Sequence, residues 1–194
     1  PQPSALSLYQ RDPENMLLAR GPRFRFDAEV IRDSALFTSG LLVEKVGGKS
    51  VKPYQPNGLW EAVAFVGSTT SQFKRDAREA LYRRSMFTFW KRTSPPPQMT
   101  TFDAPSREVC AVRRPRTNTP LQALATMNDE QYVEASRHFA RRMLLEGGTT
   151  YPDRLIHGFR LVTGRKPSPA ELEVLARRLV SPAARFRPRR QPRH

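Results

Sequence analysis

The stretch TPLQALATMNDEQYVEASRHFARRMLLEGG, residues 119–148, decides the fold class because it carries the start and stop signals of two consecutive helices. Thr119, Pro120 and Gln122 form a capping box with proline at the first helical position. Asp129 can cap a second helix, which Gly147 then ends. Apolar residues recur at helical spacing, so the stretch predicts one helix after Thr119 and another over residues 130–146.

The residues that follow predict a helical hairpin over 150–180. Its first helix is expected over residues 152–163, and a second capping box, formed by Ser168 and Glu171, starts the other. Residues 181–194 have neither a helical nor a strand period, so we expect a disordered basic tail there.

The residues before Thr119 predict a main helical domain over 12–148. A helix is expected from Asp27 to Ser39. Residues 85–93 are rich in β-favouring residues, with Met86, Thr88 and Trp90 on one side and Phe87, Phe89 and Lys91 on the other, which favours a strand. Residues 108–113 suggest a second strand, so we expect a short β-hairpin within about 85–113. Proline is abundant, with 18 residues, which predicts long irregular connections, including a polar loop over 93–119. The fold class is therefore mainly α.

The ends of the sequence lead us to expect a fragment of a larger protein. The chain starts at Pro1, without an initiator methionine or the apolar segment of a signal peptide. We therefore interpret residues 1–11 as a linker from an upstream domain. No apolar run approaches the roughly 18 residues of a membrane span.

The net charge of +15 raises the question of nucleic-acid binding. Residues 181–194 alone hold five arginines and no acid, which leaves 28 basic against 18 acidic residues elsewhere. Many of those arginines stand next to acids, as Arg32 does to Asp33, a pattern that indicates ion pairing within the fold. Because a basic stripe and a recognition motif are lacking, nucleic-acid binding is only our third hypothesis.

The densest group of polar side chains lies between Trp90 and Asn118. Aromatic, arginine and carboxylate side chains in this pattern could stack on and pair with an anionic ligand or a sugar, with Asp103 and Glu108 as an acid–base pair. The interpretation we favour is that these side chains pin a proline-rich loop to the helices through ion pairs. The candidate residues of this polar patch are Trp90, Arg92, Asp103, Arg107, Glu108, Arg113, Arg114, Arg116 and Asn118.

The remaining candidate residues do not form a recognisable metal-binding or phosphate-binding motif. Cys110 is the single cysteine, and His138 and His157 stand in predicted helices, so we expect no metal site. Residues 47–50 read Gly-Gly-Lys-Ser, but Val43 occupies the place where a phosphate loop needs its first glycine.

Several stretches together resemble the domain of unknown function 1553, across roughly residues 10–180. They are GPRFRFDAEVIRD (21–33), SGLL (39–42), GGKSVKPYQPNGLWE (47–61), LYRR (81–84), FWKRT (89–93), FDAPSRE (102–108) and RTNTPLQAL (116–124). After Val180 the sequence departs from the family pattern. The resemblance implies the C-terminal domain of a large planctomycete-type protein with a cytochrome-c-like domain upstream.

That setting shapes the expected function. The resemblance implies a periplasmic or extracellular location, with haem c held in the upstream domain and no cofactor in this chain. It supplies no catalytic residues. We expect a binding or scaffolding module that contacts the upstream domains of its own polypeptide. The alternatives are an enzyme domain acting on a glycan or other anionic polymer, with the polar patch as its site, and nucleic-acid binding through basic charge.

Overall fold

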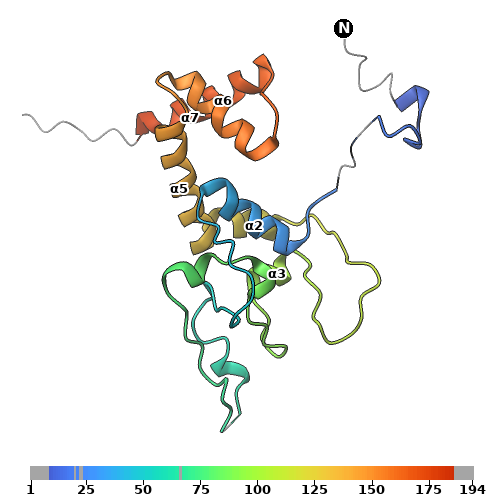
Figure 1. The fold of residues 1–194 in the computed structure, drawn as a ribbon, viewed down its shortest axis with the longest axis vertical. Helices are drawn as coiled ribbons and strands as arrows, with labels where there is room; N and C mark the ends of the chain where they lie inside the picture. Colours follow the sequence, from blue (N-terminus) through green and yellow to red (C-terminus); the bar gives the residue numbers. More distant parts are fainter. Residues whose placement is uncertain (1–8, 20, 22–23, 66, 186–194) are drawn as a thin grey trace, which may run out of the picture.

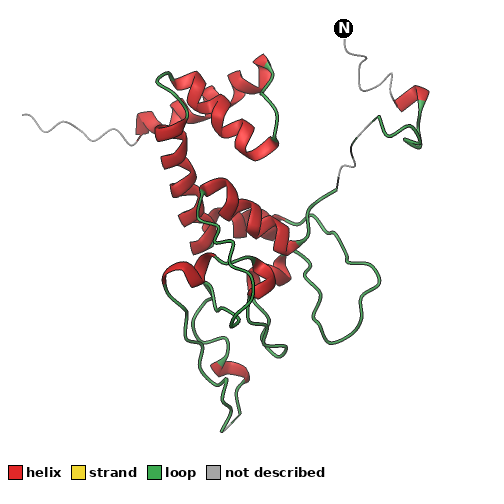
Figure 2. Cartoon of the chain, in the orientation of Figure 1, coloured by secondary structure: helices red, strands yellow, loops and turns green. Residues whose placement is uncertain are grey.

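The computed structural model describes residues 9–19, 21, 24–65 and 67–185. Within these ranges regular structure is almost entirely helical, which confirms the mainly α fold class (Figure 2). The helices are α2 (Ala28–Ser39), α3 (Pro97–Thr101), α4 (Pro120–Asn128), α5 (Glu130–Glu146), α6 (Tyr151–Thr163) and α7 (Pro169–Arg185). Short 3-10 turns η1 (Glu61–Val63), η2 (Arg78–Tyr82) and η3 (Ser85–Phe87) interrupt the long loops between α2 and α3. None of the described helices is long and apolar enough to cross a membrane.

Helix α5 is the central element, since α2, α4 and α6 all pack on it (Figure 1). The core lies where α2, α3 and α5 meet, and its buried members are Ala28, Met99, Phe102 and Tyr132. The rings of Phe102 and Tyr132 meet edge to face, with centroids 6.3 Å apart. This core fixes the start of α2 against the end of α3, which is where the polar patch begins.

The predicted helical hairpin is present as α6 and α7, which pack on each other. Its capping box forms reciprocally: the Ser168 amide donates to Glu171 Oε2 at 2.8 Å, and the Glu171 amide donates to Ser168 Oγ at 3.3 Å. Helix α7 continues through Arg185, past the end predicted at residue 180. The rest of the predicted tail, residues 186–194, and residues 1–8 of the predicted linker lie outside the described ranges.

The predicted β-hairpin within 85–113 is wrong. Residues 85–87 form η3, and Thr88 pairs in an isolated parallel bridge with Val51, far away in sequence. The Val51 amide donates to the Phe87 carbonyl at 2.9 Å, and the Phe89 amide donates to the Val51 carbonyl at 2.7 Å. Because the extended segment is already paired with the loop before it, residues 108–113 have no strand to join and remain a loop.

Candidate functional site

Asp103 organises the polar patch. It follows α3 with a φ of 61°, in the left-handed region that aspartate tolerates better than most residues. Its carboxylate accepts hydrogen bonds from the Arg25 guanidinium, the Thr117 amide at 2.8 Å and the Thr117 hydroxyl at 2.9 Å. Burial alone would raise the pKa of Asp103, but the hydrogen bonds from Arg25 and Thr117 hold it below its ordinary value. The Asp103 carboxylate therefore joins the start of the loop of residues 103–119 to Thr117 near its end.

The arginines of this loop reach back to the acidic start of α2. Arg114 Nη1 lies 2.7 Å from Glu29 Oε2 and 3.7 Å from Asp27 Oδ2. Arg107 lies 4.0 Å from Glu29, and Arg116 lies 3.9 Å from Asp27. Both carboxylates stand near the N-terminus of a helix, where negative charge is favourable. The arginines thus attach the loop to carboxylates that α2 itself stabilises.

Trp90 holds the other side of the loop. Its indole N–H donates to the Ser106 carbonyl at 3.1 Å, and the Arg107 guanidinium lies 4.4 Å from its ring centroid. Trp90 also packs against the buried core. Its ring is therefore occupied by contacts within the chain on the side where a ligand would have to stack.

The remaining members of the polar patch do not converge on these residues. Arg92, Glu108, Arg113 and Asn118 are exposed. In the part of the chain that the structure describes, their side chains make no hydrogen bond or ion pair. The structure links Trp90, Arg107, Arg114 and Arg116 through Glu29 and Asp27, and Asp103 separately ties the same loop to Arg25. Their contacts favour the interpretation that the patch pins the loop over the interpretation that it binds a glycan.

Arg32, which the sequence placed beside Asp33 as an expected ion pair, is a buried polar centre with several further partners. It is 1% exposed and donates to Gln131 Oε1 at 2.7 Å, to the Leu81 carbonyl at 2.8 Å and to the Arg83 carbonyl at 2.8 Å. Burial lowers the pKa of Arg32 to about 10, although Asp33 acts in the opposite direction. In the sequence, the adjacent Asp33 was the only indication that Arg32 has a partner within the fold. That ion pair is present, with Arg32 Nη1 3.7 Å from Asp33 Oδ1. Arg32 fastens η2 and the segment after it to α2 and α5.

Glu134 joins α5 to two tyrosines from the long loops. The hydroxyls of Tyr54 and Tyr82 each donate to its carboxylate at 2.8 Å. Burial, together with the hydrogen bond to Glu134, raises the pKa of both tyrosines. The phenols therefore stay protonated as donors, which suits a structural clamp.

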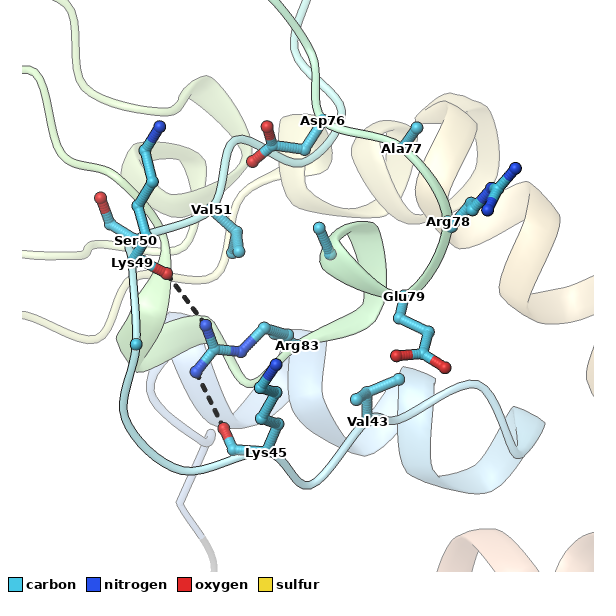
Figure 3. Close-up of a pocket in the computed structure, with 12 residues that line it drawn as sticks. Val43, Lys45, Lys49, Ser50, Val51, Asp76, Ala77, Arg78, Glu79 and Arg83 are labelled. Atoms are coloured by element: carbon cyan, nitrogen blue, oxygen red, sulfur yellow. Dashed lines mark hydrogen bonds between the residues drawn. The ribbon is translucent and has the colours of Figure 1, made fainter.

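Arg83 stands beside an open hollow of about 680 Å³, lined by the loop at residues 43–51 and by residues 76–80 (Figure 3). Its guanidinium donates to the carbonyls of Lys45 and Lys49, each at 2.9 Å, and to that of Gly47 at 2.5 Å. It also lies 4.1 Å from the ring centroid of Phe87. The Gly-Gly-Lys-Ser segment thus wraps around an arginine, a partner that motif spacing could not reveal.

Within the described ranges, no three histidine, cysteine, aspartate or glutamate side chains are grouped so that they could hold a metal ion. Cys110 is a free, exposed thiol in the loop of the polar patch.

Comparison with known proteins gives one match. The family model described as a protein of unknown function (DUF1553) matches residues 2–179, so the chain belongs to this family. Searches of curated proteins and of solved structures find no match.

Proposed function

We propose that this member of the DUF1553 family is a non-catalytic scaffolding module that packs against upstream domains of its own polypeptide. The observation that carries the proposal is the apolar face of α4. Leu121, Leu124 and Met127 are 60%, 52% and 65% exposed, whereas Gln122 on the same helix is 5% exposed. The three apolar side chains are three residues apart, so they share one side of the helix.

The total surface of the chain supports the same proposal. It is 15,062 Å² for a mass of 22.2 kDa, whereas a compact monomer of that mass exposes about 9,400 Å². The residues outside the described ranges account for at most about 3,400 Å² of this total, at about 160 Å² each. Large exposed apolar areas are typical of surfaces that another domain covers. Exposed apolar side chains contribute to this excess, among them Leu121, Leu124 and Met127, which favours a chain that completes its burial against a neighbour.

A separate hollow beside α2, with apolar and charged walls, is a second exposed area. Its volume is about 790 Å³, and its walls include Val30 and Phe37 of α2, Met86 of η3 and Val162 of α6. These side chains are 44%, 60%, 62% and 62% exposed. Burial of a Leu, Phe or Met side chain contributes about 1.5–3 kcal/mol, so covering even half of each would stabilise a docked domain by several kcal/mol.

We place this module in an extracytoplasmic protein that carries haem c in an upstream domain. The resemblance set out under Sequence analysis is the basis for this setting. In the full-length polypeptide, a pyridine haemochrome spectrum and a cleaved signal peptide would be the expected findings. A full-length polypeptide that lacks both haem c and a signal peptide would refute the extracytoplasmic haem-protein setting. It would leave open whether the apolar face of α4, the proposed docking face, is covered by another domain.

Hydroxyl-radical footprinting tests the docking face directly. The oxidation rate of Met127 is compared between this chain alone and the full-length polypeptide, and the radical dose is calibrated with an added peptide. We expect at least a threefold slower oxidation of Met127 in the full-length polypeptide. Equal rates in the two proteins would show that α4 is not covered and would refute the scaffolding proposal.

A further inference from the structure

We infer that the hollow beside Arg83 binds a small oxyanion, a phosphate or sulfate group. The hollow lies between the loop at residues 43–51 and residues 76–80 (Figure 3). No residue of the polar patch is part of its lining. The inference concerns ligand binding and does not depend on the scaffolding role of α4.

The first argument is the unbalanced charge of Arg83. Its side chain is almost completely buried, with 5% of the residue exposed. Its two terminal nitrogens bind loop carbonyls, whereas its Nε is buried without a hydrogen-bond partner. Across the described residues no carboxylate forms an ion pair with it, although Asp33 pairs with the neighbouring Arg84. Buried charges in proteins are normally paired, so this guanidinium lacks a counter-ion.

The second argument is the set of charges around the hollow. Lys45, Lys49 and Arg78 line it, and over the described ranges none of the three is ion-paired. The carboxylates in the lining are Asp76 and Glu79. Asp76 is occupied, since its Oδ2 accepts the Lys52 amide at 2.7 Å.

With Arg83, the lining therefore has four cations against two carboxylates, which matches the charge of a monoanion or dianion. Guanidinium and ammonium groups are the usual protein partners of phosphate and sulfate oxygens.

The third argument is the backbone of the loop. Gly47 and Gly48 have φ values of 76° and 82°, which side chains with a Cβ rarely adopt. These two glycines let the chain turn around Arg83 so that the carbonyls of Lys45, Gly47 and Lys49 converge on its guanidinium. The carbonyls fix the position of Arg83, and the anion would then be held by side chains. This differs from a nucleotide phosphate loop, in which backbone amides hold the phosphate.

Titration calorimetry with inorganic phosphate and with inorganic sulfate tests the inference. The protein is the wild-type chain, and sodium chloride keeps the ionic strength constant. The main variant is Lys45→Gln with Lys49→Gln, because both side chains are exposed and replacing Arg83 itself could unfold the loop. The matched control is Lys74→Gln with Lys166→Gln, which removes the same charge from exposed positions outside the hollow.

We expect the Kd for phosphate or sulfate to rise at least tenfold in Lys45→Gln/Lys49→Gln and to stay within twofold of wild type in the control. A third titration with a sugar sulfate separates the possible sources of the group. Tighter binding than inorganic sulfate would assign an esterified group, and weaker binding would assign the free ion. No measurable heat with either inorganic ion, or equal loss of affinity in the main and control variants, would overturn the inference.

Discussion

Replacing Asp103 with alanine is expected to release the loop of residues 103–119 from the start of α2. The carboxylate accepts hydrogen bonds from Arg25, from the Thr117 amide at 2.8 Å and from the Thr117 hydroxyl at 2.9 Å. The Arg25 and Asp103 side chains are 22% and 14% exposed, so water screens their ion pair only in part. If the polar patch is structural, the loss of this carboxylate must appear as a loss of stability.

The size of that loss follows from the contacts. A partly buried, charge-assisted hydrogen bond such as the one from Arg25 contributes about 1.5–3 kcal/mol. Thr117 is exposed, so water can replace its bonds, and they contribute at the low end of about 0.5–1.5 kcal/mol. Alanine in the left-handed conformation of this residue, with its φ of 61°, costs about 1 kcal/mol more, because its Cβ crowds the backbone there. We therefore expect Asp103→Ala to lower the free energy of unfolding by about 3–5 kcal/mol.

Urea unfolding followed by circular dichroism measures this change, with two companion variants. Asp103→Asn keeps an acceptor and tolerates the same backbone conformation, so we expect about half the loss. Glu108→Ala removes an exposed carboxylate from the same loop, and we expect a change below about 0.5 kcal/mol.

The pH dependence gives an independent check. Because the pKa of Asp103 is lowered in the folded chain, its stabilisation is present above its ordinary pKa and is lost as the pH falls through the lowered value. The difference between wild type and Asp103→Asn should therefore shrink only at strongly acidic pH. If Asp103→Ala and Glu108→Ala had equal, small effects on unfolding, the structural interpretation of the polar patch would be refuted.

Two further predictions concern the region where α5 leads into the C-terminal hairpin. In Gly147→Ala, the added Cβ would lie 2.4 Å from the Met143 carbonyl oxygen and 2.8 Å from Arg154 Cα, so α5 and α6 must separate. We expect a loss of about 3 kcal/mol in urea unfolding, whereas a loss below about 1 kcal/mol would contradict this close approach. The Arg165 side chain and the Ser168 backbone lower the pKa of Glu171 to about 2. The carboxylate should therefore still cap the start of α7 at pH 4 and lose the cap only as the pH falls toward 2. Amide hydrogen exchange at the start of α7, measured against pH, would show this loss. In Glu171→Gln that pH dependence should disappear; its persistence would show that another group causes it.

The elements that the sequence predicted are those whose signals are local. The two capping boxes and the glycine ends of the helices act within a few residues, so α4, α5, α6 and the start of α7 follow from neighbouring side chains alone. The β-hairpin failed because strand pairing depends on a partner, and the partner of Thr88 is Val51. The sequence pattern of residues 85–93 predicted a strand, but residues 85–87 form η3 and Thr88 pairs with Val51 in an isolated bridge.

The same distinction holds for the polar groups. Composition located the patch around Asp103 because its members lie close together in the sequence, but their partners Asp27 and Glu29 lie in another helix. The burial of Arg32 and Arg83 could not be predicted, because periodicity treats arginine as a surface residue. Both are buried, and both satisfy carbonyls of irregular loops, which lack the internal hydrogen bonds of helices. A loop-rich fold with a small apolar core therefore needs buried arginines to fix its backbone.

Helix α4 carries this reasoning from stability to function. Its periodicity predicts that Leu121, Leu124 and Met127 face inward, yet in the structure these side chains face outward. Gln122 takes the inward position because its side chain donates to the Thr101 carbonyl at 3.0 Å and to Thr117 Oγ1 at 3.2 Å. Those bonds tie α4 to α3 and to the loop of the polar patch, so rotating the helix to bury its leucines would break them. A surface that covers this outward face, as the proposed scaffolding role requires, would bring the local pattern and the tertiary contacts into agreement, so α4 is the place to test that proposal.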